Sequence, residues 1–198
     1  MIANTSATAT AVAEPTLTAG EKERALLYLE QTRSGLRGAL RNLSDAQWNF
    51  KPNSTRWSIA EIVEHVVYVQ ERVLGPIWDQ LTQAPPAPPH ADYKQVDELV
   101  IARFPNRLNK FPSPVQPSGR VPLSSALQRL LANYDQFNKR LEVPELRQHS
   151  IEAAPMKAVS NGAYQSMDGY QWILAVAAHT ERHTKQILEV MAEPDYPA

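Results

Sequence analysis

The feature that most restricts the fold of this 198-residue chain is the uneven distribution of its 16 prolines. Proline lacks a backbone N–H group and clashes with the preceding helical turn, so long helices have to lie where prolines are sparse. Four such stretches carry apolar residues at the helical period, and each predicts a helix. They cover about Glu21–Leu43, the stretch that begins at Ser58, about Ser124–Leu141, and about Asp168–Met191.

Capping signals support the starts of the first two helices. Thr18 and Glu21 have the spacing of a capping box, in which two side chains satisfy free backbone N–H groups at a helix start. Ser58 and Glu61 repeat this spacing before the second helix. Further along that helix, Pro76 follows a glycine and predicts a kink or a break.

A proline-studded connector, Ala84–Pro122, separates the second and third helices and contains a predicted short helix at about Ala91–Phe104. Neighbouring antiparallel helices need only short links, so a connector of this length lets helices two and three run parallel. No stretch shows the strict alternation of a β-strand. We therefore predict an all-α four-helix bundle with a long Pro-rich crossover between helices 2 and 3. Residues 1–19 are predicted to form a flexible N-terminal tail, and residues 20–193 a single domain.

Composition excludes several classes of function. Lys and Arg total 20 against 21 Asp and Glu, and no basic cluster is present, which argues against nucleic-acid binding. The absence of cysteine excludes disulfides, thiolate metal sites and a cysteine nucleophile. The N-terminus does not resemble a signal peptide, and no apolar run approaches the roughly 20 residues of a membrane helix. We expect a cytoplasmic protein that binds neither nucleic acid nor membranes.

Three histidines lie on predicted core-facing stripes. His179 and His183 are spaced i, i+4, which places their rings on one helix face about 6 Å apart along the axis. His65 shares a register with Ile62 and Val69, so its ring should enter the same interior from another helix. Three neutral imidazoles would supply a metal site with positions open to water or substrate. The alternative is three core histidines, each with one hydrogen-bond partner.

Other metal motifs fit the sequence poorly. Di-iron bundle sites use Glu-x-x-His pairs, yet Ile62, Val176 and Thr180 stand three residues before the three histidines. A zincin places its glutamate directly after the first ligand, whereas Glu181 follows His179 by two positions, about 200° around the helix. We therefore predict that Glu181 faces solvent. No Gly-rich phosphate loop or Gly-x-Ser-x-Gly motif is present.

The other two histidines and three of the tryptophans are not candidate metal ligands. His90 lies in the Pro-rich connector and His149 in the loop before the last helix, and both are predicted to be solvated. Trp48, Trp57 and Trp172 are predicted to pack the bundle, and one of them could line the mouth of a pocket.

Three runs of sequence resemble the DinB-like superfamily of four-helix bundles. They are Trp48–Pro52, Trp57–His65 and His179–Ile187, and the resemblance extends over about Glu21–Met191. It implies an up-down-down-up bundle that pairs as a homodimer. It also implies one divalent ion, nickel or zinc with iron and manganese as alternatives, bound by one histidine of the second helix and a His-x-x-x-His pair of the last. At the matching positions this sequence has His65, His179 and His183.

The resemblance also implies a chemistry. Characterised members of the superfamily include thiol-dependent S-transferases and a thiol-dependent isomerase, in which the metal activates a low-molecular-weight thiol. We therefore expect a metal-dependent enzyme that activates a thiol, or water, for attack on a small-molecule substrate. The alternative is a non-enzymatic, dimeric helical-bundle protein of interaction or stress response, with a structural or vestigial metal site. The three histidines are predicted as metal ligands, and the sequence indicates no catalytic residue.

Overall fold

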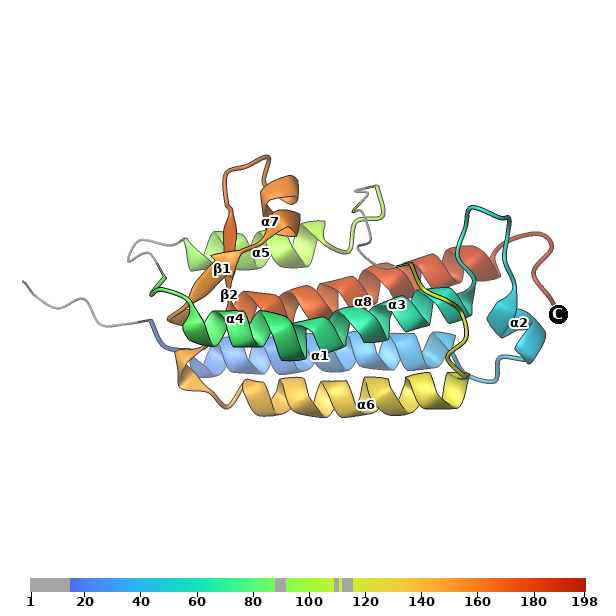
Figure 1. Cartoon of the computed structure of the whole chain (residues 1–198), viewed down its shortest axis with the longest axis horizontal. Coiled ribbons are helices and arrows are strands. Elements are labelled where there is room, and N and C mark those ends of the chain that lie inside the picture. Colours follow the sequence, from blue (N-terminus) through green and yellow to red (C-terminus); the bar gives the residue numbers. More distant parts are fainter. Residues whose placement is uncertain (1–14, 88–91, 109–110, 112–115) are drawn as a thin grey trace, which may run out of the picture.

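The structure is a computed structural model that describes residues 15–87, 92–108, 111 and 116–198. Helices make up most of these residues (Figure 1). They are α1 (Ala19–Ala39), α2 (Asp45–Asn49), α3 (Ile59–Arg72), α4 (Trp78–Gln83), α5 (Tyr93–Arg103), α6 (Leu123–Arg140), α7 (Ala154–Val159) and α8 (Gly169–Met191). The prediction of a mainly helical chain is therefore confirmed.

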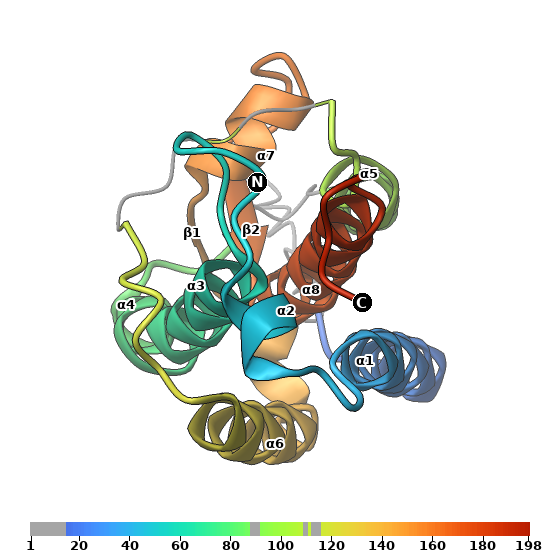
Figure 2. The ribbon, with the colours of Figure 1, turned by 90° about the vertical axis from the view of Figure 1, so that its right-hand side faces the viewer.

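The helices α1, α3, α6 and α8 lie side by side along the long axis of the molecule (Figure 1). α1 and α8 run in one direction, and α3 and α6 run in the other (Figure 1). Viewed from one end, the four surround a shared interior, and α5 covers the outer side of α8 (Figure 2). α8 contacts α1, α3 and α5, so its side chains meet neighbours on several sides.

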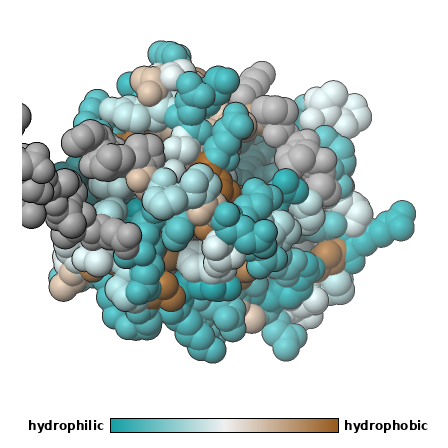
Figure 3. Space-filling model, turned by 60° about the vertical axis from the view of Figure 1, so that its left-hand side comes forward, coloured by the Kyte–Doolittle hydropathy of each residue, from teal (hydrophilic) through white to brown (hydrophobic). Residues whose placement is uncertain are grey.

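The apolar interior divides into two clusters along α8. The first part of α8, up to Ala178, contributes to one cluster with α1, α5 and the end of α6. Ile187 and Val190, near the end of α8, join a second cluster with α3 and the start of α6. His179 and His183 lie on the segment of α8 between these clusters. The outer surface is mainly hydrophilic on the face in Figure 3, with scattered apolar residues.

A buried polar network connects the long helices next to this segment. Gln70 of α3 donates to the hydroxyl of Thr180 at 3.3 Å, and Asn133 of α6 donates to the Gln70 oxygen at 3.2 Å. Close by, the hydroxyls of Thr32 and Tyr134 approach to 3.5 Å between α1 and α6. Buried polar groups need partners, so this network favours one alignment of α8 against α3.

The predicted helix starts agree closely with the structure. The capping boxes of Thr18 with Glu21 and of Ser58 with Glu61 are both formed. The first helix is shorter than predicted, because it ends at Ala39 and Asn42 adopts a left-handed conformation with φ 58°. A capping box at Asp168 starts α8.

Pro76 lies in a π-helical turn, Val73–Ile77, that joins α3 to α4. The helical backbone therefore continues to Gln83 beyond the predicted kink or break. A wider turn accommodates a residue that cannot donate a backbone hydrogen bond. The connector helix expected at about Ala91–Phe104 is confirmed as α5.

Beside the helices, the structure contains a small β-hairpin that the sequence did not predict. Strands β1 (Ser150–Glu152) and β2 (Ser166–Asp168) pair antiparallel, with Ser150 opposite Asp168. Each strand has three residues, which is too few to show a period of two in the sequence. The hairpin encloses α7 and leads directly into α8.

A buried ion cluster fixes the start of α8. Arg147, in the 3₁₀ turn Pro144–Arg147, is 2% exposed and donates to three carboxylates. The distances are 2.6 Å to Glu21, 2.7 Å to Asp97 and 2.9 Å to Asp168. The cluster therefore ties α1, α5 and the N-terminus of α8 to the segment before the hairpin.

Most of the predicted N-terminal tail, residues 1–14, lies outside the described residues. Leu17 donates its backbone N–H to the Pro144 carbonyl at 3.0 Å, so the chain is already held just before α1. Within the described ranges, none of the helices has the length and apolar character needed to cross a membrane.

Candidate metal centre

Helices α3 and α8 bring His65, His179 and His183 together in the interior. The Nε2 atom of His179 lies 3.1 Å from Nε2 of His65 and 3.1 Å from Nε2 of His183. His65 and His183 are buried, and His179 is partly buried. Among the described residues, these three side chains form a group of ligand atoms that all lie within 4.8 Å of one another. The sequence had predicted this meeting across two helices.

Two of the separations between the three nitrogens suit a shared cation. Ligands about 2.0–2.1 Å from one ion, at angles between 90° and 110°, are separated by roughly 2.8–3.4 Å. Each of the two 3.1 Å separations falls in this range. The three side chains therefore could hold one divalent ion.

The protons and lone pairs of the three imidazole nitrogens also favour a shared cation. A neutral imidazole nitrogen presents in its ring plane either one proton or one lone pair. Nε2 of His179 faces two other imidazole nitrogens at 3.1 Å, so it can complete a normal hydrogen bond with one of them and not both. A cation between the rings would accept a lone pair from each nitrogen and satisfy all three.

Burial keeps all three histidines neutral at pH 7. Removal from water disfavours the imidazolium form, which lowers the pKa of His65 from 6.5 to about 4 and that of His183 to about 3. The pKa of His179 is lowered well below 6.5 by burial and by the other two rings. Neutral imidazoles are the form that binds metals, so folding prepares the ligands.

These pKa shifts predict an acid-sensitive metal-free protein. The unfolded chain binds a proton at each histidine near pH 6.5, whereas folded His65 does so only near pH 4, so acid favours unfolding. When the pH falls from 7.5 to 5, protonation of His65 in the unfolded chain should by itself lower the free energy of unfolding by about 2 kcal/mol. Urea unfolding in the presence of a chelator, on wild type and His65→Leu, measures this difference. Equal losses of stability in the two proteins on acidification would contradict it.

Aromatic and cationic side chains surround the histidines. The ring of Trp57 lies 5.0 Å from that of His65 and stacks at 6.5 Å on that of His183. Trp57 therefore contacts the candidate centre as well as packing against the second apolar cluster. Arg182, which is buried, donates to the Asn106 carbonyl and contributes to the lowered pKa of both His179 and His183.

Glu181 faces away from the three histidines, as predicted. Its carboxylate accepts a hydrogen bond from the Tyr28 hydroxyl at 2.7 Å and pairs with Lys185 at 2.6 Å. Tyr28 is a partly buried residue of α1 and Lys185 is half exposed, so the carboxylate is held at the contact of α8 with α1 and is not placed as the general base of a zincin.

We expect Glu181→Gln to leave metal affinity and any metal-dependent turnover within about tenfold of wild type, whereas loss of a true general base costs about a hundredfold or more. The glutamine keeps an oxygen for the Tyr28 hydroxyl, so the fold should be retained. Metal binding and turnover of the two proteins, compared side by side, check this. A collapse of turnover in a folded, metal-loaded variant would revive the zincin interpretation.

The other histidines and tryptophans lie elsewhere. His90 is outside the described residues. The prediction that His149 is a plain solvated residue was wrong, because its Nδ1 bonds to the Ala84 carbonyl at 2.7 Å and the ring is partly buried. Trp48 and Trp172 are buried, as predicted for packing residues.

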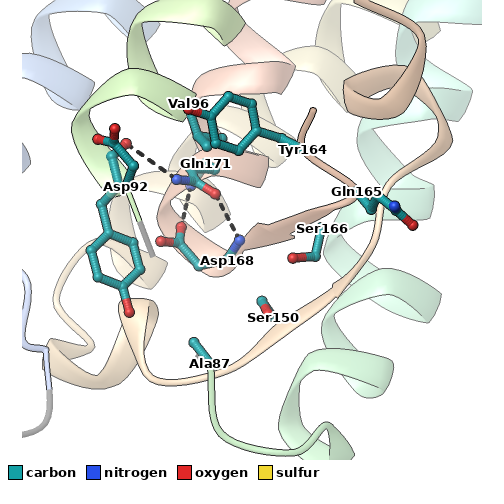
Figure 4. A pocket seen from close by; sticks show the side chains of 10 residues that line it. Ala87, Asp92, Val96, Ser150, Tyr164, Gln165, Ser166, Asp168 and Gln171 are labelled. Carbon is teal, nitrogen blue, oxygen red and sulfur yellow. Dashed lines mark hydrogen bonds between the residues drawn. The ribbon is translucent and has the colours of Figure 1, made fainter. Parts of the chain in front are cut away.

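A separate cavity of about 80 Å³, lined by both polar and apolar residues, lies at the start of α8 (Figure 4). Tyr164, Ser166, Asp168 and Gln171 are among its lining residues, and the last two bond to each other there (Figure 4). His179 is eight residues further along α8 than Gln171, or about 12 Å at the helical rise. The cavity has room for a few water molecules and is not part of the histidine cluster.

Comparisons with known proteins identify the family. The family model described as the DinB superfamily matches residues 28–187, which include all three histidines. The chain belongs to the DinB superfamily. Among curated proteins, this DinB-superfamily chain is similar to the uncharacterized protein YuaE of Bacillus subtilis, with 25% identity over 155 residues, covering 76% of this chain and 87% of YuaE. No solved structure matches the chain significantly.

The sequence analysis did not predict the polar side chains that surround the three histidines of this DinB-superfamily protein. Nδ1 of His183 bonds to Oε1 of Gln186 at 2.8 Å, and Arg107 donates to the same oxygen at 3.3 Å. The i, i+3 spacing of His183 and Gln186 was a usable signal, because such residues are neighbours on a helix. Arg107 is 79 positions from Gln186, in a segment without a helical period, and nothing in the sequence pointed to it.

Proposed function

We propose that this protein is a divalent-metal-dependent enzyme that activates a low-molecular-weight thiol, or water, for attack on a small-molecule substrate. The observation that carries the proposal is the convergence of the Nε2 atoms of His65, His179 and His183. Membership of the DinB superfamily, which is associated with metal-binding proteins, supports it. Nickel and zinc fit three imidazole ligands best, with iron and manganese as alternatives.

The surroundings of the three histidines favour an anionic reactant. The three imidazoles are neutral at pH 7, so the ligands would leave the double positive charge of a divalent ion uncompensated. Arg182, together with Arg107 in its ion pair with Glu189, lies near His183 and disfavours its protonation. A divalent ion bound there would act as a Lewis acid and lower the pKa of a thiol or water at its open position. Trp57 covers one side of the cluster and shields it from bulk water.

The remaining expectations form part of the same proposal. We propose that residues 20–193 act as one domain, in which the four long helices work as an up-down-down-up bundle. The bundle would pair as a homodimer. A small molecule is the proposed substrate, because the acidic and basic residues are balanced in number and do not suggest a nucleic-acid partner.

The proposal is tested by measuring S-transfer with each ion. Protein purified without a nickel-leaching column is stripped with a chelator, reloaded with nickel, zinc, manganese or ferrous iron, and mixed with a thiol and a chromogenic aryl halide. In this reaction an S–C bond forms, halide leaves, and the thiol proton passes to solvent. We expect turnover that requires an ion and disappears in His179→Ala.

A parallel assay with a chromogenic ester tests for activation of water by the same centre. Ester hydrolysis without thiol transfer would assign the protein as a hydrolase. Metal binding without turnover in either assay would favour the alternative of a structural metal site in an interaction protein. Failure to bind any of the four ions would contradict the proposal as a whole.

A further inference from the structure

His183 has an outer hydrogen bond that fixes how its ring is held. Its Nδ1 atom lies 2.8 Å from Oε1 of Gln186, one helical turn further along α8. The other ring nitrogen, Nε2, faces His179. The two nitrogens of the His183 ring therefore have different surroundings. Nδ1 faces outward to Gln186, and Nε2 faces the candidate metal centre.

Arg107 determines which end of the Gln186 amide faces the ring. Its NH1 group donates to the same Oε1 atom at 3.3 Å, while its Nε and NH2 groups donate to both oxygens of Glu189 at 3.2 and 3.1 Å. An arginine has only donors, so the amide atom it contacts must be the oxygen. An oxygen can only accept, so Nδ1 of His183 must carry the proton, and its Nε2 then presents a lone pair.

His179 offers a contrast on the same helix. Its Nδ1 atom is buried and has no hydrogen-bond partner among the described residues. In the part of the chain that the structure describes, no comparable hydrogen bond selects the tautomer of His179. The hydrogen bond that Nδ1 of His183 donates to Gln186 is therefore a specific feature of His183 and is not shared by His179.

We propose that Gln186, oriented by Arg107, is a positioning residue that locks His183 in the Nδ1–H tautomer and directs its Nε2 lone pair at the metal position. This inference rests on the proposed metal-binding function. A ligand held in the binding tautomer needs no proton shift when an ion binds, and a hydrogen-bonded imidazole is a stronger donor to the ion. Arg107 thereby links the segment after α5 to a proposed ligand on α8.

Metal affinity measures the proposed effect. Gln186→Met keeps the length of the side chain and removes its oxygen, so we expect about a tenfold to hundredfold loss of affinity, the range found for outer partners of metal ligands. Gln186→Glu keeps an acceptor oxygen and should bind within about threefold of wild type or more tightly. Gln136→Met, at an exposed glutamine within α6, is the matched control and should bind as wild type.

A second measurement needs no metal. Nitrogen-15 NMR of the metal-free protein at pH 7.5 should show His183 as the Nδ1–H tautomer, and Gln186→Met should lose that preference. An Nε2–H tautomer in wild type, or unchanged affinity in Gln186→Met, would overturn the inference. If wild type binds no ion, the proposed function fails, while the NMR result still decides whether Gln186 sets the tautomer.

Discussion

Replacing Arg147 with methionine is expected to lower the free energy of unfolding by about 3–5 kcal/mol. The reason is the pair of carboxylates that the change would leave buried without their cation, since Asp97 is 3% exposed and Asp168 is 1% exposed. Burial, together with the nearby charge of Asp97, already raises the pKa of Asp168 to about 6 although Arg147 is present. Removing one partner of a buried ion cluster costs far more than the net contribution of the cluster to folding.

Two further variants test whether buried carboxylates without their cation cause this loss of stability. Arg129→Met removes an arginine from a pair with Glu71 in which both side chains are 40% exposed, so its cost should be about 0–1 kcal/mol. The double variant Arg147→Met/Asp97→Asn buries one charge fewer and should recover part of the lost stability. Urea unfolding at pH 7.5 measures all three. A cost below about 1 kcal/mol for Arg147→Met would show that the cluster does not hold the start of α8 as the contacts indicate.

The features that could be predicted from the sequence are those set by local rules. Capping boxes depend on residues three apart, and both predicted boxes form. The shared register of Ile62 and His65 on one helix, and of His179 and His183 on another, follows from the helical period. These rules were enough to select the three histidines that the structure brings together.

The features that could not be predicted depend on the path of the chain between helices. Each strand of the hairpin has three residues and is formed by pairing with the other strand. Strands this short show no period of two in the sequence. Arg147 lies near Asp97 because α5 packs against α8, and the sequence does not indicate this packing. The contact of Trp57 with His183 likewise depends on how the loop before α3 lies over α8.

His179→Ala is expected to lower the affinity for a divalent ion by more than about a hundredfold, because loss of an outer partner alone costs up to that much. Of the three histidines, His179 is the one whose Nε2 lies 3.1 Å from Nε2 of both others, so its removal takes away the central nitrogen of the proposed ligand set. Competition with a chromogenic chelator at pH 7.5 measures the affinity, and circular dichroism verifies that the variant is folded.

Histidines outside the cluster provide the controls for this variant. His149 bonds to a backbone carbonyl, and His90 lies outside the described residues. Alanine at either position should leave the affinity unchanged. Equal affinity in His179→Ala, His149→Ala and wild type would remove His179 from the proposed ligand set.

The central claim is that α3 and α8 share one ion, and thermal unfolding of wild type and His65→Ala, each with and without metal at pH 7.5, tests it most directly. An ion that binds only the folded state stabilises it by about 2.7 kcal/mol when free metal is a hundredfold above its dissociation constant. His65 lies 114 positions before His179, so it contributes to this gain only if the folded helices hold one ion between them. We predict a clear rise in the melting temperature of wild type and the loss of most of that rise in His65→Ala. An undiminished rise in His65→Ala would show that the α8 pair binds metal without α3, and the three-histidine centre would be wrong.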